Sequence, residues 1–144
     1  MTRTKKTLAL LAGGATLTFL CYDVIPTYWM RWFRQGVFKK GPADRRIYLT
    51  FDDGPDPRYT PRLLDLLKKH QVKACFFLVA QRAHSHPELV NRMLQEGHEI
   101  GFHSLEHVNA WIKGPRATAE DFQRGLAMME NQGWHVTRYR PPWG

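Results

Sequence analysis

Residues 72–79 read VKACFFLV, an almost unbroken apolar run. A run of this kind is typical of a β-strand that is covered on both faces, as strands of a parallel sheet are. Shorter strand-like segments lie at Ile47–Phe51 and His98–His103, and a further one begins at Arg138–Arg140. The pattern therefore predicts four strands of one sheet.

Helix signals fill the three gaps between these strands, at Thr60–His70, Ser85–Gly97 and Thr118–Gly133. Each segment begins at a residue suited to cap a helix, and Ser85 and Glu88 have the spacing of a capping box. Strands that alternate with helices predict an α/β fold with a parallel sheet and right-handed crossovers, either a barrel or a doubly wound sheet. In both architectures functional residues follow the C-terminal ends of the strands.

The 144 residues carry a formal net charge of +8, which is distributed unevenly. Nine basic and two acidic residues precede Ile47, whereas twelve basic and eleven acidic residues make up the rest. A nucleic-acid-binding domain gathers basic residues on its own surface, so the nearly neutral C-terminal part argues against nucleic acid as a partner. The two cysteines, Cys21 and Cys75, are too few for a disulfide framework.

The apolar stretch Thr7–Ile25 follows three basic residues and precedes a cluster of tyrosines and tryptophans. This order is typical of a membrane-inserted segment. We predict an uncleaved signal anchor at residues 1–25, because no small-x-small cleavage site follows the apolar core. A cleaved signal peptide and a buried or interfacial helix are the alternatives. Residues 26–45 are predicted to be a juxtamembrane linker, and residues 46–144 a folded domain.

Two polar segments lie where the first and third predicted strands end. TFDDGP at residues 50–55 carries Asp52 and Asp53, although a solvated turn fits this composition equally well. GFHSLEH at residues 101–107 spaces His103 and His107 four apart, which on a helical turn places both imidazoles on one face. Two imidazoles and one carboxylate, with positions left open, form a catalytic metal site. Two ordinary polar histidines would satisfy the spacing too.

A third segment, RYRPPWG at residues 138–144, follows the fourth predicted strand. It joins a cation, a rigid turn and an aromatic side chain, and a purely structural turn with a packed tryptophan is the alternative. All three segments would meet at one edge of a parallel sheet. That convergence predicts a functional site without reference to any family.

The three segments together resemble the motifs of the polysaccharide deacetylase family, the carbohydrate esterases with a NodB-homology domain. TFDDGP is similar to the family's first motif, GFHSLEH to its second and RYRPPWG to its third, and the resemblance covers residues 46–144. The family's fold is a distorted (β/α) barrel of the glycoside hydrolase/deacetylase kind. The resemblance therefore implies that this chain holds the N-terminal part of such a barrel.

The resemblance also implies a role for each site residue. Asp52 would be the general base, oriented by Arg140, and Asp53, His103 and His107 would bind a divalent metal, most commonly Zn²⁺, with Co²⁺ or another divalent ion in its place as the alternative. The substrate-binding residues would be Ser104, Pro141, Pro142 and Trp143. The implied reaction removes N-acetyl groups from a polysaccharide containing N-acetylglucosamine, such as peptidoglycan, chitin or a surface glycan, and releases acetate.

Two features depart from the family pattern. Phe102 stands where the family often has Asn, and no counterpart of the later Asp-rich segment or of the Leu-His pair with the general acid is present. We therefore expect an incomplete domain with weak metal binding and inefficient turnover. A non-catalytic carbohydrate-binding relic and an amidohydrolase of small amides are the alternative functions. A surface glycan as substrate would place the domain outside the cytoplasm, anchored to the membrane or secreted.

Overall fold

The computed structural model describes residues 3–33 and 47–143, which belong to two separate compact units, Met1–Arg46 and Ile47–Gly144. The first unit is helical and consists of α1 (Arg3–Phe19), a π-helical turn η1 (Leu20–Val24) and α2 (Ile25–Phe33). None of the helices in the described ranges is both long and apolar enough to cross a membrane. The structure thus gives no support to the predicted anchor, and the predicted linker at residues 26–45 lies largely outside the described residues.

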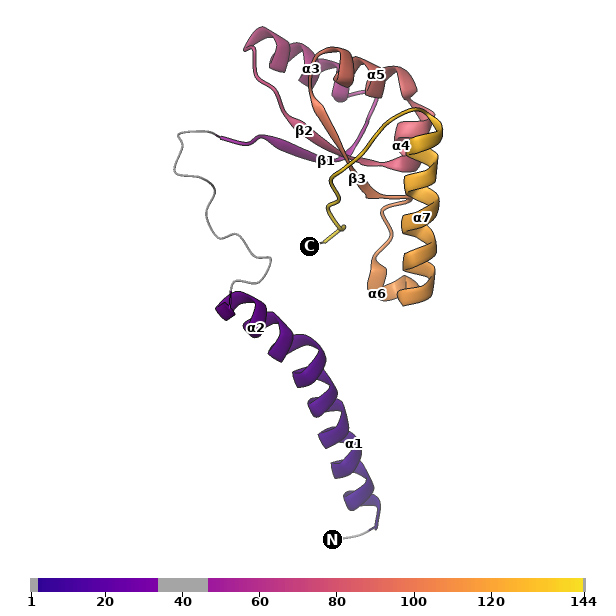
Figure 1. Cartoon of the computed structure of the whole chain (residues 1–144). Helices are drawn as coiled ribbons and strands as arrows, with labels where there is room; N and C mark the ends of the chain where they lie inside the picture. Colours follow the sequence, from indigo (N-terminus) through magenta and orange to yellow (C-terminus); the bar gives the residue numbers. More distant parts are fainter. Residues whose placement is uncertain (1–2, 34–46, 144) are drawn as a thin grey trace. The chain divides into compact units, whose positions relative to one another are not determined.

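The second unit is an α/β domain built on a three-stranded parallel sheet (Figure 1). Its strands lie side by side in the order in which the chain makes them, β1 (Thr50–Gly54), β2 (Cys75–Val79) and β3 (Glu99–Ser104). The helices are α3 (Thr60–Lys69), α4 (Ala80–Ser85), α5 (Pro87–Gln95), α6 (Ala110–Lys113) and α7 (Pro115–Asn131). The α/β class and the parallel sheet are therefore as predicted.

The two faces of the sheet differ in what covers them. Alternate residues of a strand point to opposite faces, and Phe76, Leu78 and Phe102 join the apolar core beneath the helices. Leu64 of α3 and Val90 of α5 complete this core and are fully buried. Burial of these side chains from water supplies the main driving force for folding of the unit. The opposite face carries the polar groups of the candidate site.

Several element boundaries differ from the sequence prediction. The first strand begins at Thr50, three residues later than expected, and it includes Asp52 and Asp53. The helix predicted from Thr118 begins at Pro115, and the Thr118 hydroxyl donates to the Gly114 carbonyl at 2.7 Å instead of capping the helix. The fourth strand is reduced to an isolated parallel bridge between Tyr139 and Phe102.

Two short helices, α4 and α6, were not predicted from the sequence. The α4 helix begins directly where β2 ends, and Ser85 forms its last residue. The Ser85 hydroxyl donates to the Gln81 carbonyl at 2.9 Å, so the predicted capping box with Glu88 is wrong. Pro87 begins the next helix instead, a position where proline is favoured because it needs no N–H partner.

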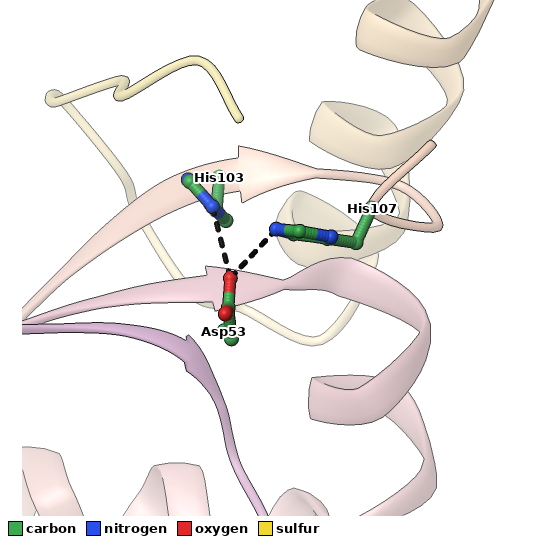
Figure 2. A group of neighbouring side chains, drawn as sticks. All are labelled: Asp53, His103 and His107. Atoms are coloured by element: carbon green, nitrogen blue, oxygen red, sulfur yellow. Dashed lines mark ion pairs between the residues drawn. The ribbon is translucent and has the colours of Figure 1, made fainter. Parts of the chain in front are cut away.

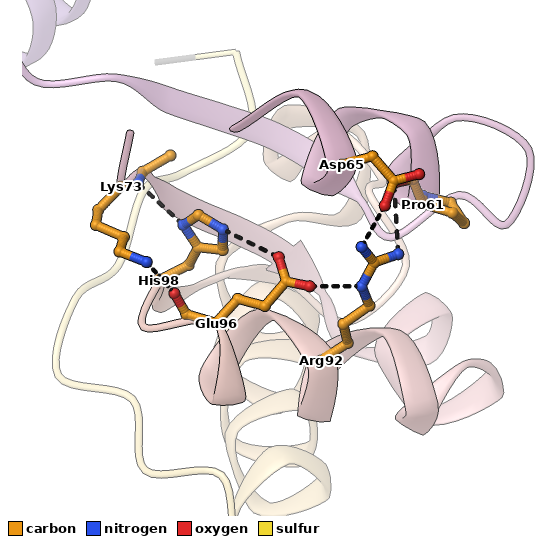
Figure 3. A network of polar contacts seen from close by, with 7 residues as sticks. Pro61, Asp65, Lys73, Arg92, Glu96 and His98 are labelled. Carbon is orange, nitrogen blue, oxygen red and sulfur yellow. Dashed lines mark hydrogen bonds and ion pairs between the residues drawn. The ribbon is translucent and has the colours of Figure 1, made fainter. Parts of the chain in front are cut away.

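A polar network joins the N-terminal ends of β2 and β3, away from the candidate site (Figure 3). His98 immediately precedes β3, and its Nδ1 atom accepts a hydrogen bond from the Ala74 N–H at 3.2 Å. Glu96 lies with Oε2 at 4.0 Å from His98 Nε2 and binds Arg92 through Oε1 at 2.8 Å. The Lys73 ammonium donates to the Glu96 carbonyl. Burial of the imidazole, reinforced by Lys73 and partly offset by Glu96, lowers the pKa of His98.

Candidate metal and catalytic site

Asp53, His103 and His107 converge at the C-terminal ends of the strands (Figure 2). One carboxylate oxygen of Asp53, Oδ1, lies 3.1 Å from His103 Nε2 and 2.8 Å from His107 Nε2. The three ligand atoms all lie within 4.8 Å of one another. Two ligands that bind one ion at about 2.1 Å are at most about 4.2 Å apart, so a small side-chain movement completes the set.

A bulge in β1 explains how neighbouring Asp52 and Asp53 both reach the site. Phe51 pairs with Phe76 and Gly54 pairs with Leu78, so β1 has one residue more than β2 between these two pairs. Asp53 has a positive φ of 68°, a left-handed conformation that aspartate tolerates better than most residues. A bulge of this kind redirects a side chain. Asp53 therefore faces the histidines, while Asp52 binds Arg140.

His103 occupies a similar irregularity in β3. Leu78 and Val79 of β2 pair with Phe102 and Ser104, so His103 is the extra residue. The helical turn predicted for His103 and His107 is wrong, because His103 lies in a strand and His107 in the loop that follows it. The two imidazoles meet because that loop turns back, with ring centroids 5.1 Å apart.

Hydrogen bonds and an ion pair hold the loop after β3. The Ser104 hydroxyl accepts a hydrogen bond from the His107 N–H at 2.8 Å, where His107 has a φ of 59°. Asp121 of α7 accepts from the Leu105 N–H at 3.2 Å, and Lys113 pairs with the same carboxylate. Gln81 of α4 donates its main-chain N–H to the Leu105 carbonyl at 3.1 Å. Helices on both sides thus set the position of His107.

Ser104 was expected to contact the substrate. Ser104 is only 5% exposed, and its hydroxyl accepts a hydrogen bond from the His107 N–H. This position suits a residue that supports the loop.

The donor set fits a divalent metal ion. His103 Nδ1 lies 2.7 Å from the carbonyl oxygen of Arg140, which only accepts hydrogen bonds. The Nδ1 atom is therefore the protonated nitrogen, and the lone pair of Nε2 is directed toward Asp53. Metal-binding histidines are commonly oriented in this way. Two imidazole nitrogens and one carboxylate oxygen are the ligands of a catalytic site with open positions.

Asp52 lies beside this set and has a different partner. Arg140 Nη1 donates to Asp52 Oδ1 at 2.7 Å and lies 3.1 Å from the Thr50 hydroxyl. The Arg140 backbone pairs with β3, since its N–H donates to the Phe102 carbonyl at 3.0 Å. The structure thus brings together the carboxylate predicted to accept a proton, the cation predicted to orient it, and the three candidate metal ligands.

The remaining predicted residues lie on the segment after Arg140. The Trp143 ring lies 4.5 Å from the His107 ring between centroids and is 63% exposed. Pro142 lines a small pocket together with Ser104 and Val108. Pro141 is exposed. An exposed aromatic ring beside the candidate metal ligands is suited to contact the face of a sugar.

Two residues that contact the site were not predicted from the sequence. Arg82 of α4 donates to the main-chain carbonyl of Asp53 at 2.6 Å, and the Phe77 ring lies 4.1 Å below the Arg140 guanidinium. Both act across strands that are far apart in the sequence. No local sequence pattern identifies either residue as part of the site. Phe77, for example, looks like one more apolar residue of a buried strand.

Comparison with known proteins identifies the family of this chain. The family model described as polysaccharide deacetylase matches residues 39–144. A peptidoglycan-N-acetylglucosamine deacetylase of Bacillus cereus is 40% identical over 101 residues, which cover 70% of this chain and 47% of that protein. A chitooligosaccharide deacetylase of Sinorhizobium fredii is 44% identical over 78 residues, which cover 54% of this chain and 36% of that protein.

A solved structure gives the same result for the fold. The peptidoglycan deacetylase PdaC from Bacillus subtilis superposes with a TM-score of 0.66 at 37% identity, over 73% of this chain and 52% of that one. The chain thus spans about half, or less, of the length of these relatives.

Proposed function

This chain belongs to the polysaccharide deacetylase family, and we propose that it hydrolyses N-acetyl groups of a polysaccharide that contains N-acetylglucosamine. The observation that carries the proposal is the separation of roles within one site. Asp53 Oδ1 contacts the Nε2 atoms of His103 and His107. The adjacent Asp52 instead pairs with Arg140 and is not one of the three candidate metal ligands. Metal-assisted hydrolysis of an amide uses a metal ion to activate water and the carbonyl, and a separate base to take the proton.

The ion held by Asp53, His103 and His107, which we propose is Zn²⁺, would polarise the acetyl carbonyl and lower the pKa of water. Arg140 holds Oδ1 of Asp52, so Oδ2 is the oxygen that accepts the proton from the attacking water. Trp143 stands beside His107 and would form one wall of the sugar site. The products are acetate and a free amine on the sugar.

The barrel architecture is part of the proposal. One face of the sheet is covered by helices, and the other carries a groove of about 520 Å³ lined by Thr50, Cys75 and Phe77, among others. A groove on the inner face, with functional groups at the strand ends, is what the first strands of a (β/α) barrel would present. The similarity to PdaC supports this architecture.

The location of the domain outside the cytoplasm is also a proposal. It is supported by the substrates in the names of the relatives, of which peptidoglycan is one. Protease treatment of intact cells tests it, since an outward-facing domain is digested before lysis. A domain that stays protected until the cells are broken would contradict it.

Acetate release tests the enzymatic function. The purified chain is incubated with N-acetylglucosamine oligomers after addition of Zn²⁺, and in parallel with a chelator. We expect slow acetate release with the ion and none with the chelator. Equal release from small acetylated amides would favour the amidohydrolase alternative, and no release under any condition would contradict the proposal.

A further inference from the structure

The Arg140 guanidinium contacts three groups at once. Its Nη1 atom donates to Asp52 Oδ1 at 2.7 Å and to the Thr50 hydroxyl at 3.1 Å. Its central carbon, Cζ, lies 4.1 Å from the centroid of the Phe77 ring, so the cation rests on the aromatic face. The edge of the guanidinium thus binds the base, and an apolar ring supports its plane.

The ion pair alone is a weak means of orienting Asp52. The side chains of Arg140 and Asp52 are 38% and 37% exposed. Water competes for both charges at such positions, and exposed ion pairs therefore hold their geometry poorly. A planar guanidinium that also stacks on an aromatic ring loses much of its freedom to rotate. The contact with Phe77 supplies the restraint that the ion pair lacks.

The position of the Phe77 ring is set by the neighbouring strand. Phe77 of β2 pairs in register with Gly101 of β3. A Cβ atom at Gly101 would lie 2.7 Å from two carbons of the ring and 3.2 Å from the Arg138 carbonyl oxygen. Only glycine permits so close an approach. The missing side chain of Gly101 therefore gives the Phe77 ring its place beneath Arg140.

We propose that Phe77 is a positioning residue for deacetylation: its ring holds the Arg140 guanidinium in the orientation that directs Asp52. The inference rests on the proposed function, in which Asp52 takes the proton. It does not assign Phe77 any contact with substrate or metal. Its effect on the reaction passes through Arg140 alone.

The side-chain NMR signals of Arg140 test the contact directly in the full chain. The Arg140→Lys variant identifies these signals by their loss. A guanidinium stacked on a ring shows signals shifted by the ring current and slow rotation about the Nε–Cζ bond. We expect both in the unaltered chain, which needs no further variant. Unshifted signals with fast rotation would overturn the proposal.

Three variants separate the ring from general packing. Phe77→Leu removes the ring, Phe77→Tyr keeps it, and Phe76→Leu makes the same change on the opposite face of β2, where Phe76 packs in the core. We expect the shift and slow rotation to be lost in Phe77→Leu alone. Equal loss in Phe76→Leu, or retention in Phe77→Leu, would overturn the proposal.

Kinetics then connect the contact to the reaction. Loss of a cation–π contact predicts a roughly threefold to tenfold lower kcat for Phe77→Leu. KM should be unchanged, and kcat should be restored in Phe77→Tyr. An unchanged kcat in Phe77→Leu would overturn the positioning role. If the unaltered chain releases no acetate, the proposed function fails, and the NMR signals still decide whether Phe77 holds Arg140.

Discussion

The Nδ1 atom of His103 donates a hydrogen bond to the main-chain carbonyl oxygen of Arg140 at 2.7 Å. The side chain of Arg140 at the same time binds Asp52. One residue, far from both in the sequence, therefore orients a proposed metal ligand with its backbone and the proposed general base with its guanidinium. Arg140 thus contacts both the proposed metal site and the proposed base.

The Asp52→Asn substitution separates the base from the ligands. Asparagine cannot accept a proton from water, and Asp52 is not among the three ligand residues. We expect kcat to fall by at least about 100-fold, in line with the contribution of a general base, while the metal content stays the same. Acetate release and metal analysis on one preparation provide the measurement.

Asp65→Asn is the matched control for this loss of charge. Asp65 lies on α3, where it pairs with Arg92 at 2.5 Å, and its side chain is 69% exposed. It should retain both metal and turnover. Turnover retained in Asp52→Asn, or metal lost from it, would contradict the assignment of Asp52 as an unliganded base.

The sequence predicted the identity of the site better than its geometry. The residue types and their place after predicted strands were sufficient to select Asp52, Asp53, His103 and His107. The helical turn expected for the two histidines is wrong, because Ser104 continues a strand and a side-chain hydrogen bond turns the loop. Such a turn depends on contacts with distant helices that periodicity does not encode.

The limits of element prediction have a similar cause. The β1 bulge at Asp53 depends on pairing with β2, so it leaves no mark in the local pattern. The α4 helix begins directly after Val79 without a side-chain cap, and cap residues are what identify a helix start in a sequence. The bridge at Tyr139 replaces a strand because few residues there pair with β3.

The Ser104→Ala substitution tests the support of His107. It removes the hydroxyl that accepts a hydrogen bond from the His107 N–H. His107 itself has a left-handed backbone with a φ of 59°. We expect a roughly tenfold to hundredfold lower metal affinity, as for loss of other groups that orient metal ligands. Zn²⁺ titration by calorimetry measures it. Ser104→Thr keeps the hydroxyl and should retain affinity, so equal affinities in the Ala and Thr variants would contradict this role.

The Asp121→Asn substitution tests the second support of the same loop. Asp121 accepts from the Leu105 N–H and pairs with Lys113. The neutral amide loses the pairing with Lys113, so we expect a roughly threefold to tenfold lower metal affinity, a weaker effect than that of Ser104. Glu120→Gln, at an exposed position of α7, is the control. An equal effect in both variants would exclude a specific role for Asp121.

His98 makes the stability of the domain depend on pH. Burial lowers its pKa in the folded chain below the ordinary value of 6.5, so the unfolded chain binds a proton more readily. The stabilisation is complete above pH 6.5 and is lost as the pH falls from there through the folded pKa. Denaturant unfolding measured between pH 5 and about 7.5 should show that the free energy of unfolding decreases as the pH is lowered through this window.

His98→Asn should flatten this dependence, since asparagine does not titrate and its carbonyl oxygen can still accept from the Ala74 N–H. His135→Asn is the matched control, because it makes the same substitution at an exposed histidine. The His135 variant should keep the pH dependence of the unaltered chain. Identical pH profiles for the His98 variant and the unaltered chain would show that His98 does not cause the effect.

Metal stoichiometry tests the central claim most directly. Equilibrium dialysis against Zn²⁺ is carried out with the unaltered chain, with Asp52→Asn and with His107→Ala, whose ring is partly exposed. The site formed by Asp53, His103 and His107 predicts one ion per chain for the unaltered chain and for Asp52→Asn, and none for His107→Ala. An unaltered chain that binds no ion, or a His107→Ala variant that binds it equally well, would contradict the assignment.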